Sequence, residues 1–194
     1  MPTKTRSRSG ESAWNGNNTG VLVGAAMAGA AVGLAANMGR KLFVQFAGHS
    51  GDWFDTLKTE HDLALALFDK IQATDDSQTT MRSHLLMKLK HALAKHAFQE
   101  ENVIYPALRD ANEREKADHL NGDHGYVKTY LYELESMAKD DPAWLARVGD
   151  FRKMIEQHMR EEENDIFPAL RARLSEEKNR ELTMMMNKEG LQLA

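Results

Sequence analysis

The chain contains no cysteine, which excludes disulfides, thiolate nucleophiles, iron–sulfur clusters and cysteine-ligated zinc. Any metal must therefore be held by nitrogen and oxygen atoms. Proline is scarce, with four residues in 194, and runs that alternate β-branched with polar residues are rare, so β-strands are not expected. Neither the G-x-x-x-x-G-K-[ST] phosphate loop nor the G-x-S-x-G nucleophile turn occurs. These absences indicate an all-α protein without thiol, P-loop or serine-hydrolase chemistry.

The chain also lacks an excess of positive charge. Its formal net charge is −4 and its isoelectric point is near 6.1, and the basic residues are scattered along segments that carry acids as well. Proteins that bind nucleic acid usually gather lysine and arginine on one face or stripe. We therefore expect no nucleic-acid partner.

The longest apolar run in the sequence is short for a transmembrane helix. Residues 1–19 are polar and predict a disordered tail, whereas residues 20–48 are rich in glycine and alanine and predict a helical segment. Its charge-free run from Val21 to Ala36 has 16 residues, against the roughly 20 that a transmembrane helix needs. A membrane span, a signal peptide, and a helix over residues 20–46 for self-association or membrane attachment remain alternatives. We expect a cytoplasmic protein, with membrane association or a homo-oligomer through this segment.

The remainder of the chain has the periodicity of amphipathic helices. Apolar residues recur at intervals of three and four, and short polar loops separate the segments, which are predicted at about 52–73, 79–108, 118–138 and 143–170. Such lengths and loops predict an antiparallel four-helix bundle over residues 49–174. A further short helix is expected within residues 175–194, from about 175 to 188, ending before Gly190. The fold class is all-α, with the glycine- and alanine-rich helix and the C-terminal helix added to the bundle.

One fourteen-residue motif occurs twice in the sequence. The segment from His96 to Arg109 recurs from His158 to Arg171, and both copies contain His-x-x-x-Glu-Glu-Asn followed by Ile, an aromatic residue and Pro-Ala-Leu-Arg. On an α-helix, residues four apart lie about 40° apart around the axis and roughly 6 Å along it. The imidazole and the first carboxylate of each copy can therefore reach one metal centre.

Each copy follows a helix with another well-placed histidine. His61 precedes His96 by 35 residues and His124 precedes His158 by 34, which fits two helical hairpins of nearly equal length. In all four helices these histidines continue the stripe of apolar residues, so they are expected to point into the core. The candidate metal ligands are His61, His96, Glu100, His124, His158 and Glu162.

Four histidines and two glutamates in an apolar interior need partners, because burying an unpaired charged group costs several kcal/mol. A pair of metal ions would satisfy them, and bundles commonly build dinuclear sites from facing helices. In the arrangement we expect, Glu100 and Glu162 bridge the two ions, and one ion is held by His61 and His96 and the other by His124 and His158. The sequence alone does not fix this pairing of the histidines. The alternative is two helix-stabilising His–Glu pairs, worth about 0.2–0.5 kcal/mol each, together with two ordinary core histidines.

Other polar residues near the motif are not expected to be metal ligands. His84, His91 and His119 lie off the apolar stripes and are predicted to be surface or boundary residues. Glu101 and Glu163 fall about 100° from the preceding glutamates and are expected on a solvated face. A hydrogen bond from a ligand histidine N–H to these acids is the alternative.

With these residues in place, the chain resembles the hemerythrin-like, or HHE cation-binding, domains over roughly residues 52–172. The resemblance rests on His61, His124 and the two His-x-x-x-Glu-Glu motifs with Pro106 and Pro168. It implies a non-haem centre of two oxo- or hydroxo-bridged iron ions, favoured over zinc or manganese. It also implies that the centre binds oxygen, nitric oxide or peroxide, or senses iron or redox state.

The chain departs from the oxygen-carrying hemerythrins at one position. Those proteins have a fifth histidine four residues from the third-helix ligand, where this sequence has Leu120 before His124 and Lys128 after it. The missing ligand is expected to be His119 or an acid such as Glu60 or Asp123, or to be absent altogether.

The departure favours a sensor or a reactive centre over a dedicated oxygen carrier. The function expected first is reversible binding or sensing of a small diatomic ligand or peroxide. An enzyme that reduces peroxide or nitric oxide at the same site is the second alternative, and a bundle that metal holds together for structural purposes is the third.

Overall fold

The computed structural model describes residues 51–193, and every regular element in this range is helical. The predictions for residues 1–19 and 20–48 lie outside the described residues. The elements are α2 (Trp53–Gln72), α3 (Thr79–Gln99), the π-helix η1 (Glu100–Ile104), α4 (Tyr105–Asp110), α5 (Arg114–Ser136), α6 (Trp144–Glu161), the π-helix η2 (Glu162–Ile166), α7 (Phe167–Arg173) and α8 (Glu176–Gln192).

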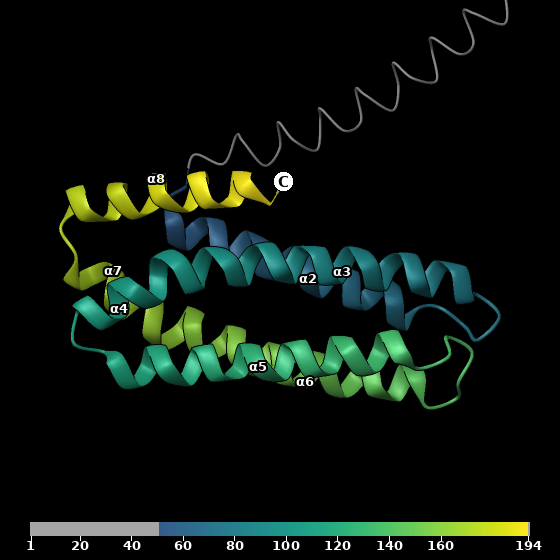
Figure 1. Ribbon diagram of the computed structural model, residues 1–194. Helices are drawn as coiled ribbons and strands as arrows, with labels where there is room; N and C mark the ends of the chain where they lie inside the picture. Colours follow the sequence, from purple (N-terminus) through teal and green to yellow (C-terminus); the bar gives the residue numbers. More distant parts are fainter. Residues whose placement is uncertain (1–50, 194) are drawn as a thin grey trace, which may run out of the picture. The chain divides into compact units, whose positions relative to one another are not determined.

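Two antiparallel hairpins form the four-helix bundle that the sequence predicts. α2 and α3 make one hairpin and α5 and α6 the other, and the two lie against each other along their length (Figure 1). α2 contacts both α3 and α6, and α5 contacts both α6 and α3. The Asp52 side chain accepts hydrogen bonds from the backbone N–H groups of Phe54 and Asp55 and so begins α2. The fold class is confirmed.

The two long helices that carry the repeated motif are interrupted at matching positions. We expected each to continue through the motif and to kink or end at the proline, but a π-turn lies between two α-helices in both copies. The N–H of Tyr105 bonds to the carbonyl of Glu100, and that of Phe167 to the carbonyl of Glu162. Pro106 and Pro168 follow directly and lack the N–H that an α-helix would use there, which is compatible with this change of hydrogen-bond register.

The apolar core consists of two clusters. One lies toward the end of the bundle with the α2–α3 and α5–α6 loops and includes Phe68, Trp144 and Phe151, which are fully buried. The other includes Trp53 and Phe167 and contains buried residues of α4, α7 and α8. Along α2, α3 with η1, and α5, the candidate ligands fall between residues of the two clusters, and along α6 and η2 Met159 of the first cluster lies between His158 and Glu162. The polar residues therefore form a layer between apolar parts of the interior.

Helix α8 packs beside the first hairpin rather than extending the bundle. The side chain of Ser175 caps its start, and Trp53 bonds to it twice, from its backbone N–H to Thr183 Oγ1 and from its indole N–H to Asn179 Oδ1. The predicted end before Gly190 is wrong, because the helix runs through that residue to Gln192. A Cβ at Gly190 would lie 2.8 Å from Gln99 Nε2, so glycine allows this close approach.

Among the helices within residues 51–193, none combines the length and the apolar character needed to cross a membrane.

Candidate metal centre

The six candidate ligands come together in the middle of the bundle, although they are drawn from four helices and two π-turns. Both glutamates have 0% of their surface exposed, and none of the four histidines exceeds 6%. Their donor atoms fall into two overlapping groups, each with all atoms within 4.8 Å of one another. One group contains His61, His96, Glu100 and Glu162, and the other contains Glu100, His124 and His158.

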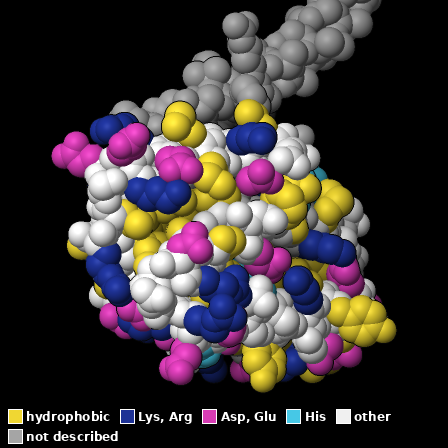
Figure 2. Space-filling view, turned by 60° about the vertical axis from the view of Figure 1, so that its left-hand side comes forward, with side chains coloured by type: hydrophobic (Ala, Val, Ile, Leu, Met, Phe, Trp, Pro, Cys, Tyr) yellow, Lys and Arg dark blue, Asp and Glu magenta, His cyan; other side chains and the backbone are white. Residues whose placement is uncertain are grey.

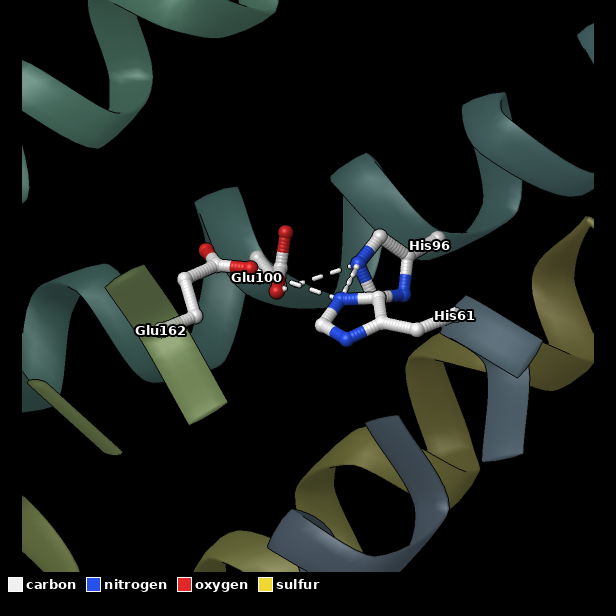
Figure 3. Close-up of side chains that lie close together, drawn as sticks. All are labelled: His61, His96, Glu100 and Glu162. Carbon is white, nitrogen blue, oxygen red and sulfur yellow. Dashed lines mark hydrogen bonds and ion pairs between the residues drawn. The ribbon is translucent and has the colours of Figure 1, made fainter. Parts of the chain in front are cut away.

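The first end of the site is formed by His61 and His96. Their Nε2 atoms lie 3.0 Å apart. Glu100 Oε1 is 3.2 Å from His96 Nε2, and Glu162 Oε2 is 3.3 Å from His61 Nε2. Figure 3 shows both rings turned toward the two carboxylates from neighbouring helices.

The second end is formed by His124 and His158, and the same two carboxylates reach it with their other oxygens. Glu100 Oε2 is 3.3 Å from His124 Nε2, and Glu162 Oε1 is 3.4 Å from His158 Nε2. Each carboxylate thus spans both ends. This geometry is compatible with the bridging arrangement predicted from the sequence and with its pairing of His61 with His96 and of His124 with His158.

The spacing of these atoms is compatible with donors that share a cation. Ligands about 2.1 Å from an ion and at right angles to each other are about 3.0 Å apart, and the observed separations are 3.0 to 3.4 Å. Glu100 Oε1, Glu162 Oε2 and His158 Nε2 are buried without any hydrogen-bond partner. Buried polar atoms rarely remain unpaired, and a cation at each end would satisfy these.

Every one of the four imidazoles is oriented from behind by a carboxylate. The distances from Nδ1 to the acid are 2.7 Å for His61 to Glu163, 3.1 Å for His96 to Glu60, 2.9 Å for His124 to Glu101 and 3.2 Å for His158 to Asp123. An Nδ1–H donated to a carboxylate leaves the lone pair on Nε2, which faces the centre. The acids therefore fix the tautomer that a metal requires.

Two of these acids correct the sequence interpretation. Glu101 and Glu163 were expected on a solvated face, but each bonds to a histidine of the opposite hairpin. Lys128 and Lys58 lie 3.6 and 3.9 Å from them on the outer side. The alternative of a hydrogen bond to a ligand histidine is therefore the one that the structure supports.

Without a metal, the carboxylates draw protons onto the imidazoles. Burial would lower the pKa of His96, but the charges and hydrogen bonds of Glu100 and Glu60 outweigh it and raise that pKa well above 6.5. Burial would also lower the pKa values of His61 and His124, but their hydrogen bonds to carboxylates outweigh it, and both pKa values are raised. Burial would raise the pKa of Glu100, whereas His96 and His124 hold it well below 4.5. The site is built to hold positive charge.

One residue of the centre was missed in the sequence. Tyr105 is fully buried, and its hydroxyl lies 3.1 Å from Glu162 Oε1, 3.1 Å from His124 Nε2 and 3.3 Å from Glu100 Oε2. In a continuous α-helix a residue five positions after Glu100 would point about 140° away from it. The π-turn brings the two onto one face, and the only sequence signal was the proline that follows.

The remaining candidates lie elsewhere. His84, His91 and His119 are exposed, as expected, and His119 pairs with Glu161 at 3.2 Å. Neither His119 nor the acids Glu60 and Asp123 supplies a donor to the centre, because the two acids are engaged with Nδ1 of His96 and His158.

Comparison with known proteins places this geometry in a family. The chain is 26% identical over 123 residues to a DNA nickase of Nostoc sp. (strain PCC 7120 / SAG 25.82 / UTEX 2576), covering 63% of this chain and 34% of that protein. It is 26% identical over 128 residues to an uncharacterized hemerythrin-like protein of Schizosaccharomyces pombe, covering 64% of this chain and 62% of that one. The chain thus spans less than two thirds of either relative.

A solved structure and a family model agree. The crystal structure of a hemerythrin HHE cation binding domain-containing protein from Mycobacterium kansasii, a homolog of Rv2633c, superposes with a TM-score of 0.66 at 24% identity, covering 74% of this chain and 87% of that one. Residues 53–170 match the family model described as hemerythrin HHE cation binding domain. The matched range contains the whole bundle and all six convergent side chains, and the chain belongs to the hemerythrin HHE cation-binding domain family.

Proposed function

We propose that this protein holds two iron ions in the centre described above and uses them to bind or sense a small ligand, namely oxygen, nitric oxide or peroxide, or to sense iron or redox state. Imidazole and carboxylate donors without thiolate are compatible with iron, and the hemerythrin family is associated with a pair of iron ions. Bound there, the ions would supply redox-active Lewis-acid positions that bind small anions and diatomic molecules.

The observation that carries this proposal is the way in which Glu100 and Glu162 each present one oxygen to either pair of histidines. Each end then receives two imidazole nitrogens and two carboxylate oxygens. A structural zinc site is usually closed by four ligands, whereas a six-coordinate iron ion held by four would retain positions for a small molecule.

The other residues of the centre prepare it for a cation. The four outer carboxylates each face an Nδ1 atom, so that Nε2 is the nitrogen of every ring that is left to bind a metal, giving up its proton where it carries one. The surrounding apolar clusters keep water out and strengthen the attraction between the carboxylates and a cation.

DNA cleavage is not part of the proposal, although one relative is named a DNA nickase. The chain spans only 34% of that protein and carries a net charge of −4. On the face shown in Figure 2, acidic and basic side chains are interspersed without a broad area of one sign. A surface that binds DNA is expected to carry a broad area of lysine and arginine side chains.

Metal analysis with optical spectroscopy of the aerobically purified chain tests the proposal. We expect two iron ions per chain, a near-ultraviolet oxo-bridge band, and spectral changes on adding azide or nitric oxide. A fully loaded protein that ignores these ligands would refute ligand binding. Turnover of peroxide far above that of free iron would instead favour an enzyme, and equal stabilisation by zinc without redox chemistry would favour a structural role.

Single substitutions test which residues hold the metal ions. His96→Ala or Glu162→Ala should lower the metal content to at most one ion per chain, because each removes a donor and leaves the others with uncompensated charge. His84→Ala, on the exposed side of α3, is the matched control and should keep the full content. Equal metal content in all three variants would refute the assignment of ligands.

A further inference from the structure

The two repeats differ in the residue that directly precedes their first candidate ligand. Lys95 precedes His96, whereas the uncharged and exposed Gln157 precedes His158. The acid behind each of these two histidines is of the same kind in both repeats, because it is a carboxylate from the preceding helix that faces Nδ1. The sequence difference therefore brings a lysine to one end of the centre and not to the corresponding place at the other.

Lys95 makes a close and largely buried ion pair with the acid behind His96. Its Nζ atom lies 2.8 Å from Glu60 Oε1, and the other oxygen of the same carboxylate lies 3.1 Å from His96 Nδ1. The side chain of Lys95 is 23% exposed and that of Glu60 is 8% exposed. Helix α8 covers the lysine stem, since a Cβ at Gly190 would lie 3.1 Å from Lys95 Cε. Charges that are shielded from water in this way interact more strongly.

The basic side chains beside the other three outer acids lie farther away and are more exposed. Each is 3.6 to 4.0 Å from its acid and has 48% to 71% of its side chain exposed. The three pairs are Lys58 with Glu163, Lys128 with Glu101 and His119 with Asp123. Water and salt screen exposed pairs at such distances. Positive charge outside the ring of acids is therefore distributed unequally, and its shielded part lies at the end formed by His61 and His96.

We propose that Lys95 is a positioning residue that acts through Glu60 and His96, makes the two ends of the centre unequal, and shifts the His61 and His96 end toward iron(II) over iron(III). The ammonium group draws the negative charge of Glu60 away from the ring, so that His96 Nε2 donates less strongly to an ion. Its own charge also disfavours the more positive ion. This inference rests on the proposed di-iron function and adds that the His61 and His96 end is reduced more readily.

The test is a redox titration of the full chain loaded with iron, in which dithionite supplies the electrons and ferricyanide removes them. Lys95→Gln gives the first repeat the residue of the second. At the potential that half-completes the first reduction step of the parent, the ratio of iron(II) to iron(III) should fall on the order of tenfold in this variant. Lys95→Met keeps the apolar stem against α8 without the charge and should show the same fall, whereas Lys95→Arg keeps the charge and should stay close to the parent.

Lys128→Gln is the matched control, since it removes the same charge from a side chain that is 71% exposed beside Glu101. It should change the ratio by less than about twofold. An unchanged ratio in both uncharged variants of Lys95, or an equal fall in Lys128→Gln, would overturn this inference. Either result would leave the proposed function intact, provided that the parent holds two iron ions. A parent that does not hold a pair of iron ions would overturn both.

Discussion

Glu163 offers a sharp test of how the centre holds its metal, because it touches a ligand histidine and is not proposed as a ligand. Its Oε1 lies 2.7 Å from His61 Nδ1, and the hydrogen bond to His61 lowers the pKa of the Glu163 carboxyl. Glu163→Gln keeps the size of the side chain and removes its charge. The amide must either accept the Nδ1–H more weakly or turn its NH2 group to the ring and favour the wrong tautomer.

The expected effect is a loss of metal affinity. Removing such an outer hydrogen-bond partner typically costs 10- to 100-fold in affinity, which corresponds to about 1.4–2.7 kcal/mol. We expect Glu163→Gln to fall within this range, with a native circular dichroism spectrum. Competition with a chelator for iron(II) under anaerobic conditions measures the affinity directly.

Asp165→Asn is the control, because Asp165 is an exposed residue of the same π-turn and the substitution removes the same charge. It should change the affinity by less than about twofold, since exposed charges are screened by solvent and salt. Two results would refute the reasoning: wild-type affinity in Glu163→Gln, or an equal loss in Asp165→Asn. The second would mean that net charge rather than ring orientation sets the affinity.

Further predictions concern pH and packing. Folding raises the pKa of His96 from 6.5 and lowers that of Glu100 from 4.5. The protein from which a chelator has removed the metal should therefore be most stable between pH 4.5 and pH 6.5. Its free energy of unfolding should decline as the pH rises above 6.5 or falls below 4.5, which urea titrations at several pH values can measure. Gly190→Ala should destabilise the fold by about 1 kcal/mol or more, since its Cβ would displace the Gln99 side chain that donates to the carbonyl of Met186. Gly125→Ala meets open space on α5 and should stabilise the fold by about 0.4–1 kcal/mol, so equal signs for the two glycines would contradict this packing.

The sequence predicts most of the bundle because its helices are strongly periodic and its functional motif is repeated. Residues four apart, such as His96 and Glu100, stay in phase with the apolar stripe, so their convergence follows from local geometry. The short loops require antiparallel neighbours, and the hairpins then place His61 and His124 opposite the motif.

What the sequence does not predict depends on register and on contacts between hairpins. A π-turn shifts the face of every later residue, and no propensity scale marks one, so Tyr105 was missed. Glu101 and Glu163 were assigned to solvent because a helical projection shows only the helix to which they belong. Their partners, His124 and His61, lie on the opposite hairpin. The end of α8 was misplaced because Gly190 resembles a helix stop in sequence but serves as a close contact.

The exchange of acids between the hairpins has a consequence for assembly. Each pair of histidines comes from one hairpin, yet the bridging set includes a glutamate from the other, and Glu101 and Glu163 reach across in opposite directions. Neither hairpin therefore carries the full set of candidate ligands. If the chain were cut within the loop between Asp110 and Arg114, the two fragments should recombine as complementing halves when metal is supplied, and a single fragment could reconstitute the centre only by dimerising with its own copy.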